Sequence, residues 1–318
     1  MILITGGSGY LGGRLAKHLS QSLKEKVILS IRKRSDSLEE SLPNCDFRIF
    51  DIAKNKDFQS LLEGITDVIH LISMNAQDSA LDPVLAEKIN AYGAYKLAKT
   101  SVESKVKKFI YFSTAHIYGS PLVGKINETT SAEATHPYGL THLLAENYIQ
   151  EVTKETDTNF VILRLSNAVG APLSKDVNCW MLVVNDIIKQ LVTTHTMKFS
   201  SSKYIKRDFI PISEISRTVH RILKDDSHRF TGIYNLGSGA SLSLEDLAKI
   251  ISQRAKIILN INPKIQFPEN HQNVSNSLIY SISKINKHGL HISDDLTDEI
   301  DQLIIKSQDW FNLSSDLR

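Results

Sequence analysis

The chain has 318 residues, of which 42% are hydrophobic and 23% are charged, and its formal net charge is +2. This composition is typical of a globular protein with a large core, here long enough for two lobes. The near balance of charge excludes a general electrostatic attraction to nucleic acid or to a membrane surface. Two cysteines make neither a disulfide framework nor a metal site, so we expect no bound metal.

No apolar run in the sequence approaches the roughly 20 residues that a membrane-spanning helix needs. The first expected strand begins at Met1, which leaves no room for a signal peptide. We therefore expect a cytoplasmic protein without a membrane partner.

The first residues predict a dinucleotide site. Residues 1–4 are an apolar run typical of a buried parallel strand, and a helix with one apolar face begins at Tyr10. Between them, Gly6, Gly9 and Gly12 stand three residues apart. In this context the first glycine permits a tight turn, the second lets a backbone approach a pyrophosphate, and the third lets the helix pack close to the strand. The free N–H groups at the helix start favour the anion.

The end of the second expected strand, residues 27–31, predicts which dinucleotide binds. A dinucleotide fold often carries an acid about 20 residues beyond the glycines, on the ribose hydroxyl. Here Arg32 stands at that position, followed by Lys33 and Arg34. A carboxylate would repel a 2′-phosphate, whereas arginine binds phosphate with a planar fork. The sequence therefore predicts NADP, with NAD left open. The alternative is a solvated basic loop.

Strands and helices alternate at short intervals, which predicts an α/β fold with a Rossmann-type, doubly wound parallel sheet. Residues 73–82 are polar and are expected to be irregular, and a helix is expected from Pro83 to about Glu103. Within this helix, Gly93 allows close packing and the Asn90 amide could bond inward. His70 is expected to be a packed core residue. Further strands are expected at residues 47–50, 68–72, 108–112 and 160–165.

Polar side chains gather where the fifth expected strand ends. We expect the hydroxyls of Ser113 and Thr114 to point into the cleft at the carboxyl end of the sheet. A helix begins near Pro137, whose ring suits a first turn. Tyr138 and His142 share one face of that helix because they are four residues apart.

The strict alternation weakens after Gly170, which predicts a smaller, mixed C-terminal domain that binds the substrate. We expect residues 1–166 plus about 205–240 to form the dinucleotide-binding domain, and residues 167–204 plus 241–318 the substrate-binding domain. Helices are expected at residues 186–192, after the cap residue Ser243, and at residues 296–311, with fraying of the last residues.

Several motifs together resemble the extended short-chain dehydrogenase/reductase family, in its branch of NAD(P)-dependent nucleotide-sugar epimerases and dehydratases. They follow the family's order over nearly the whole chain, and their joint order and spacing is more specific than any one of them after the glycines. The motifs are residues 5–12, Asp51-Ile52, Asn90, Ser113-Thr114, Pro137-Tyr138, Arg164 with Asn167, Arg207-Asp208-Phe209 and residues 234–239.

The resemblance implies roles for several of these residues. Tyr138 would exchange a proton and Thr114 would bond the reacting sugar hydroxyl, while hydride passes between the sugar carbon and the nicotinamide. The substrate would also meet His116, and Asn167 and Arg207 would hold its diphosphate. The implied cofactor-binding residues are Gly6, Gly9, Tyr10, Leu11, Gly12, Arg32, Asp51 and Ile52 (on the adenine), Leu71, Ser73, Asn90, Ser113, Tyr138 and His142.

The chain departs from the family at His142, because the family's motif is Tyr-x-x-x-Lys. A phenol with an ordinary pKa near 10 is a poor base unless a positive charge stabilises its phenolate. In one hypothesis His142 still donates to the nicotinamide ribose and, when protonated, supports the phenolate of Tyr138. In the other, the protein is a catalytically silent nucleotide-binding or regulatory protein. We favour the first because Thr114 and Tyr138 are both present.

A second departure narrows the expected chemistry. The family's sugar 4,6-dehydratases carry Asp-Glu after the catalytic threonine, where this chain has Ala115-His116. Elimination of water then has no evident catalyst, so we expect an epimerase or a keto-sugar reductase of nucleotide sugars. Arg32 favours the reductase, since NADPH commonly serves reductions. A reductase of a non-sugar carbonyl compound stays open, and so does a homodimer, since many relatives pair through two long helices.

Overall fold

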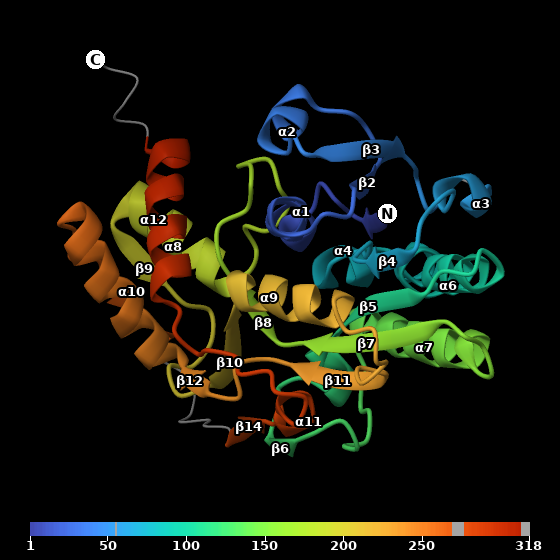
Figure 1. The fold of residues 1–318 in the computed structure, drawn as a ribbon. Coiled ribbons are helices and arrows are strands. Elements are labelled where there is room, and N and C mark those ends of the chain that lie inside the picture. Colours follow the sequence, from blue (N-terminus) through green and yellow to red (C-terminus); the bar gives the residue numbers. More distant parts are fainter. Residues whose placement is uncertain (55, 269–276, 313–318) are drawn as a thin grey trace.

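A computed structural model describes residues 1–54, 56–268 and 277–312 of the chain (Figure 1). Its largest element is a seven-stranded sheet with the strand order β11-β7-β5-β4-β1-β2-β3. Every neighbouring pair in this sheet is parallel, which confirms the expected Rossmann-type fold. The strands are β1 (Ile2–Thr5), β2 (Val27–Ile31), β3 (Cys45–Ile49), β4 (Asp67–His70), β5 (Lys108–Thr114), β7 (Asn159–Leu165) and β11 (Gly232–Leu236).

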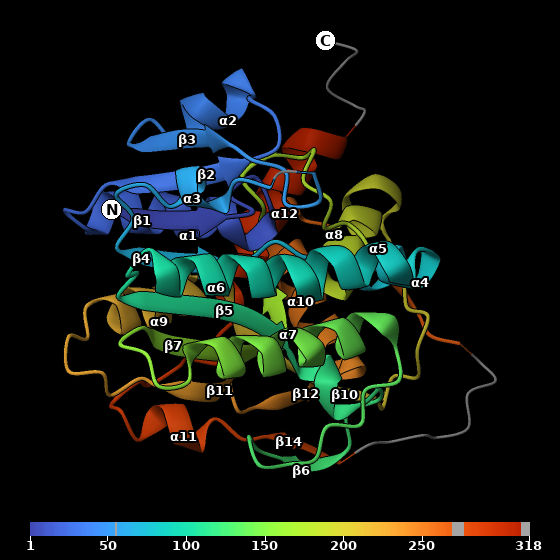
Figure 2. The ribbon, with the colours of Figure 1, turned by 90° about the vertical axis from the view of Figure 1, so that its right-hand side faces the viewer.

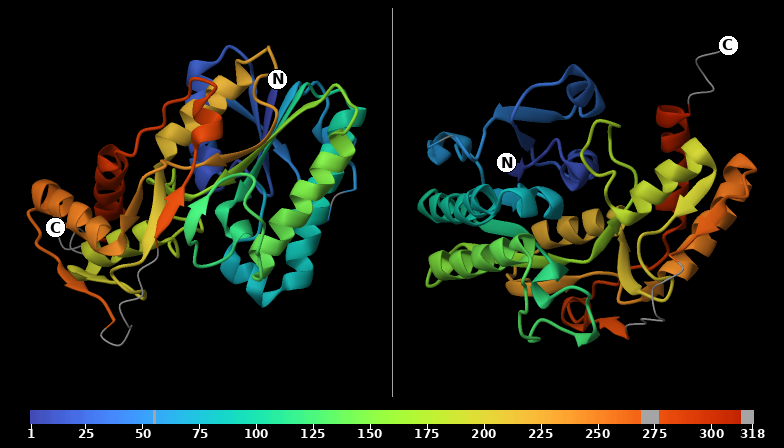
Figure 3. Two further views of the ribbon diagram at one scale, coloured as in Figure 1. Left: turned by 90° about the horizontal axis from the view of Figure 1, so that it is seen from below. Right: turned by 180° about the vertical axis from the view of Figure 1, so that it is seen from behind.

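Helices cover both faces of the sheet (Figures 2 and 3). This arrangement follows from the strands themselves, because β1, β2 and β5 are buried along their whole length. On one face α1 (Tyr10–Ser22) packs beside α9 (Ile212–Leu223), and on the other α6 (Ala94–Glu103) packs between α3 (Phe58–Leu61) and α7 (Pro137–Thr153). The same half also contains α2 (Asp36–Ser41), α4 (Ala76–Leu81), α5 (Pro83–Ala86), the π-helix η1 (Glu87–Gly93) and the 3₁₀-helix η2 (Ala115–Tyr118).

A smaller mixed sheet, with the strand order β12-β10-β8, is formed by segments that follow β7 in the chain. Its strands β8 and β10 are parallel, whereas β10 and β12 are antiparallel. A separate apolar core joins it to three helices, α8 (Val183–Thr194), α10 (Leu244–Leu259) and α12 (Thr297–Phe311). The remaining elements are β6 (Gly124–Ile126), β8 (Asn167–Val169), β9 (Thr196–Lys198), β10 (Lys206–Pro211), β12 (Ser241–Ser243), β13 (Lys264–Gln266), β14 (Leu278–Tyr280) and α11 (Ser283–Asn286).

Most expected elements occur at the expected places, and one does not. Residues 73–82, expected to be irregular, contain α4, which starts because the Asn75 side chain accepts a hydrogen bond from the Asp78 N–H at 2.9 Å. Ser243 caps α10 as expected. Within the expected dinucleotide-binding segment 205–240, β11 joins the large sheet and β10 joins the small one; the domain boundaries stay predictions. The expected fraying at the end of the chain falls on residues 313–318, outside the described residues.

The first residue of β5 ties the large sheet to a distant part of the chain. Lys108 is buried, and its Nζ donates to the carbonyl oxygens of Ile222, Leu223 and Asp225 at 2.7 to 2.9 Å. These carbonyls lie at the carboxyl end of α9, where a positive charge interacts favourably with the helix dipole. Burial lowers the pKa of the Lys108 ammonium.

No helix in the described part of the chain is long and apolar enough to cross a membrane.

Candidate active site

The glycine loop has the geometry that its spacing predicts. Gly6 has φ +72°, which glycine adopts without strain, and a Cβ on Gly12 would overlap the Gly6 carbonyl. The N-cap of α1 is Gly9, with no side-chain cap and no acid in the first turn. The first N–H groups of α1 thus have neither a helical acceptor nor a side chain in front of them. This cradle fits a pyrophosphate.

The side chain of Tyr10 leaves the cradle. Its hydroxyl donates to the Gly170 carbonyl at 2.9 Å, in the loop after β8. The next turn of α1 is held there too, because Arg14 donates to the Ala171 carbonyl and pairs with Glu299 of α12 at 2.7 Å. Only the main chain of Tyr10 is therefore available for the predicted contact with a cofactor.

Arg32, which is predicted to bind a 2′-phosphate, lies at the carboxyl end of β2. It follows the last residue of β2, and its side chain is exposed. The glycine loop touches this strand end, because the Gly7 N–H donates to the Ser30 carbonyl at 3.2 Å. Among the described residues no ion pair of Arg32 is found, whereas the nearby Arg34 pairs with Glu39.

Most of the other predicted cofactor-binding residues make contacts within the protein. Asp51 accepts a hydrogen bond from the Ala53 N–H at 3.0 Å, and Ile52 packs against Gly93. Asn90 lies in the π-helix, a form that is frequent at functional sites. Its amide bonds the Met74 N–H at 2.6 Å and the Thr141 hydroxyl at 3.1 Å, so it braces the loop after β4 against α7. Leu71 and Ser73 lie in that loop, at the carboxyl end of β4.

Thr114, Tyr138 and His142 come together at the carboxyl end of β5. The rings of Tyr138 and His142 meet edge to face with centroids 4.6 Å apart, and the Thr114 side chain is near enough to the Tyr138 hydroxyl to influence its pKa. Burial raises the pKa of Tyr138, against the weaker opposing effect of Thr114. The phenol therefore keeps its proton at neutral pH.

His142 is 2% exposed and uncharged. Burial, with smaller effects of His70 and His116, lowers its pKa to about 3. Its Nδ1 lies 2.7 Å from the Tyr111 hydroxyl, and its Nε2 is buried without a partner in the described parts of the chain. The positive charge proposed to support the Tyr138 phenolate is thus missing at neutral pH, while a nitrogen suited to a ligand is present.

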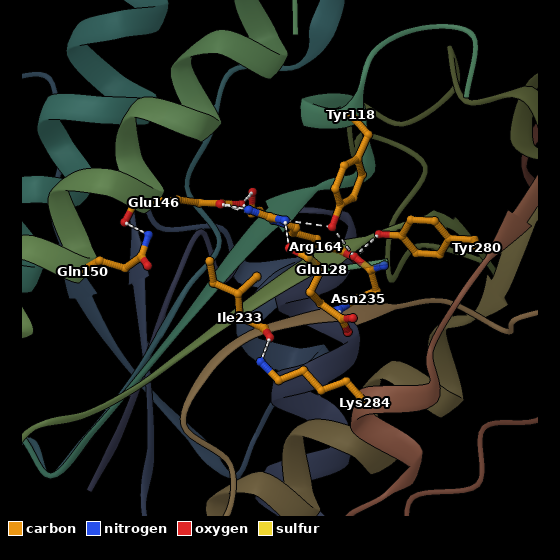
Figure 4. Close-up of polar contacts among 10 residues, drawn as sticks. Tyr118, Glu128, Glu146, Gln150, Arg164, Ile233, Asn235, Tyr280 and Lys284 are labelled. Carbon is orange, nitrogen blue, oxygen red and sulfur yellow. Dashed lines mark hydrogen bonds and ion pairs between the residues drawn. The ribbon is translucent and has the colours of Figure 1, made fainter. Parts of the chain in front are cut away.

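The prediction that both strand-end hydroxyls point into the cleft is wrong for Ser113. Its hydroxyl donates to Glu146 on α7 at 2.5 Å, because neighbouring strand residues face opposite ways. Glu146 also binds the Arg164 guanidinium through two of its nitrogens, the shorter bond being 2.7 Å (Figure 4). Tyr118 accepts from Arg164 and donates to Asn235, both at 2.7 Å. Only the main chain of Ser113 is left for a cofactor.

The substrate side combines one anchored and one unpaired polar group. Asn167 is anchored, because its Nδ2 donates to the Asp208 carbonyl at 2.8 Å. Arg207 is half-buried, has no ion pair among the described residues, and has a pKa lowered by burial. Asp208 is fully buried, and its carboxylate accepts hydrogen bonds from Ser166, Ser238 and Gly239. It is therefore not an exposed ion-pair partner of Arg207.

His116 is a neighbour of both Tyr138 and Arg207. It is exposed, its ring centroid is 5.9 Å from that of Tyr138, and its pKa is lowered by partial desolvation and by the charges of Arg207 and His136. This places a neutral imidazole next to the phenol, at the position where the resemblance puts a dehydratase acid.

Sequence reasoning missed Tyr111 and the partners of Glu146. Tyr111 looks like one more aromatic residue of a buried strand, as His70 does, and His70 is indeed packed in the core with its Nδ1 2.7 Å from the Thr5 hydroxyl. The available signal was an acid and a histidine four residues apart, on a helix next to a strand with hydroxyls at alternate positions.

Comparisons with known proteins show the family of this chain. The sequence model of the NAD dependent epimerase/dehydratase family matches residues 2–237. The chain is similar to a dTDP-D-glucose 4,6-dehydratase of Dictyostelium discoideum, 26% identical over 271 residues, which cover 79% of this chain and 61% of that protein. It is also similar to a putative UDP-glucose 4-epimerase of Methanocaldococcus jannaschii, 24% identical over 79% of this chain and 81% of that one.

Two solved structures show the same fold. The UDP-glucuronic acid 4-epimerase from Bacillus cereus, in complex with UDP-glucuronic acid and NAD, has a TM-score of 0.81 at 21% identity over 98% of this chain and 99% of its own. The UDP-glucose 4-epimerase from Thermotoga maritima, with UDP-glucose, has a TM-score of 0.78 at 20% identity over 100% and 99%.

Proposed function

Because this chain belongs to the NAD dependent epimerase/dehydratase family, we propose that it is an NAD(P)-dependent epimerase or keto-sugar reductase of nucleotide sugars, with Tyr138 as the acid/base. One observation carries the proposal. Tyr138, with the ring of His142 beside it, lies near Thr114 at the end of β5, on the same edge of the sheet as the glycine loop that follows β1. In a parallel sheet of this kind, that edge binds ligands.

The chain's residues fit a dinucleotide at both ends of this edge. The start of α1 would hold the pyrophosphate, and His142 Nε2 would meet the nicotinamide ribose. Arg32 would hold a 2′-phosphate, which makes NADP the proposed cofactor. NAD is the alternative, since NAD is present in the complexes of two structurally similar epimerases. A bound nicotinamide supplies or accepts the hydride.

Reduction is the favoured direction. Tyr138 keeps its proton, because burial raises its pKa and the neighbouring His142 is neutral. A protonated phenol can give its proton to the oxygen of a keto sugar as hydride arrives, but it is a poor base for oxidising an alcohol. Thr114 would orient the same oxygen. Ala115 and His116 offer no carboxylate for loss of water, so we do not propose a dehydratase.

A nucleotide diphosphate suits the substrate side. A half-buried guanidinium without an anion is costly, and Arg207 would gain a partner from the diphosphate. Asn167 and His116 would lie along the same molecule. The expected homodimer and cytoplasmic location stay predictions.

The experiment offers the purified protein NADPH, or NAD, with a panel of UDP- and dTDP-linked sugars and 4-keto sugars, and follows cofactor oxidation and product NMR. We expect keto-sugar reduction with NADPH, and a loss of about 10²- to 10⁴-fold in Tyr138→Phe with unchanged NADPH affinity. Interconversion of two sugars with NAD would instead identify an epimerase. Binding of cofactor without any turnover, equal in wild type and Tyr138→Phe, would identify the silent nucleotide-binding protein and overturn the proposal.

A further inference from the structure

We propose that Tyr111 is a positioning residue that holds His142 as the Nε2–H tautomer, whose hydrogen is left free to bond a ligand. The part that concerns the ligand rests on the proposed function; the part that concerns the tautomer does not. The contact between the Tyr111 hydroxyl and His142 Nδ1, at 2.7 Å, joins β5 to α7 one helical turn after Tyr138.

The count of hydrogen atoms decides the direction of this bond. Tyr111 is 1% exposed, and among the described residues its hydroxyl bonds His142 alone. If His142 Nδ1 carried the hydrogen, the phenol O–H and the Nε2 lone pair would both lie buried without partners. If the phenol donates, only the Nε2–H is left without one. Buried polar groups are rarely unpaired, so the second arrangement is favoured.

The surroundings of His142 keep the ring neutral. The titratable groups that face it are His70 from β4, Tyr111 from β5, His116 from η2 and Tyr138 one turn back on α7. None of these is an anion at neutral pH. The Glu146 carboxylate, one turn further along α7, acts on the Tyr111 phenol but is paired with Arg164. A neutral imidazole that accepts at Nδ1 must donate at Nε2, and that nitrogen has no acceptor in the described parts of the chain. A hydroxyl oxygen of a ribose is an acceptor of this kind.

The first test is NMR of the ligand-free protein with isotope-labelled histidine, which reports the tautomer without any turnover. We expect His142 to carry hydrogen on Nε2 and to keep neutral shifts from about pH 8 to about pH 5. In Tyr111→Phe we expect the Nδ1–H form to appear at His142. His70 serves as the internal control, since its ring packs on the ring of residue 111 and bonds Thr5 instead.

The second test is the affinity for NADPH, with Tyr234→Phe as the matched loss of a buried phenol hydroxyl that bonds the Arg229 carbonyl and not His142. We expect Tyr111→Phe to weaken binding roughly fivefold, the effect of one neutral hydrogen bond, and Tyr234→Phe to leave it unchanged. A wild-type His142 with hydrogen on Nδ1, or an unchanged tautomer in Tyr111→Phe, would overturn the proposal, and the wild-type spectrum decides even if the variant fails to fold. Absence of NADPH binding in the wild type would instead count against the proposed function.

Discussion

Helix α7 carries two buried polar clusters one turn apart, and they are built in opposite ways. The ion-pair cluster joins Glu146 to Arg164 and Ser113, carries two opposite charges, and finds its hydrogen-bond partners within the protein. The imidazole cluster joins His142 to Tyr111, carries no charge, and leaves Nε2 without a partner in the described structure. The difference indicates a division of labour: a cluster that satisfies itself supports the fold, whereas one that leaves a donor unpaired is suited to a ligand.

Breaking the ion-pair cluster should have the largest effect. Arg164→Met leaves the Glu146 carboxylate buried without its cation, and we expect the free energy of unfolding to fall by about 3–5 kcal/mol. Urea unfolding measures it. The double variant Arg164→Met/Glu146→Leu should recover much of the loss, because no charge is then left unpaired. If the single variant were as stable as the wild type, the cluster would not support the fold.

The imidazole cluster should make stability depend on pH. Burial holds the pKa of His70 and of His142 at about 3, below the ordinary value of 6.5. The unfolded chain therefore takes up these protons first, and stability that is complete above about pH 6.5 is lost as pH falls toward 3, by about 1.4 kcal/mol per pH unit for each histidine. His142→Gln should remove one of the two contributions. A parallel loss in wild type and variant, measured by urea unfolding over this range, would show that His142 is charged in the folded protein.

Placing a charge in the imidazole cluster should change catalysis more than stability. In His142→Lys the ammonium would lower the pKa of Tyr138, and we expect oxidation of a sugar alcohol at neutral pH to rise about tenfold, with the pH profile moved to lower pH. Reduction should gain less, because it uses the protonated phenol. His142→Gln, neutral like the wild type, is the control. Equal rates in His142→Lys and wild type would contradict the role assigned to this position.

The sequence predicts the glycine loop and the parallel sheet well, because both depend on local patterns. Gly6, Gly9 and Gly12 can be interpreted from spacing alone, and the apolar strands need two covered faces wherever they occur. The helix α4 was missed because a single cap, Asn75, starts it within a polar stretch.

The site was predictable in its parts but not in its connections. Tyr138 and His142 share a helix face by spacing, and the structure places their rings together. The charge of His142 depends on burial by β4 and β5, and the direction of the Ser113 hydroxyl depends on how β5 is set against α7. Both are tertiary facts. The partners Tyr111 and Arg164 come from strands far from α7 in the sequence.

The contacts of Lys108 also bear on how the protein is made. Its three acceptors, at the end of α9, follow it by more than a hundred residues, and the edge strand β11 comes later still. A ribosome that has released only residues 1–166 holds a sheet whose Lys108 ammonium lacks those acceptors and whose β7 lacks its outer neighbour. The nascent large sheet must therefore wait, with an open edge, until the chain has been extended past Leu236.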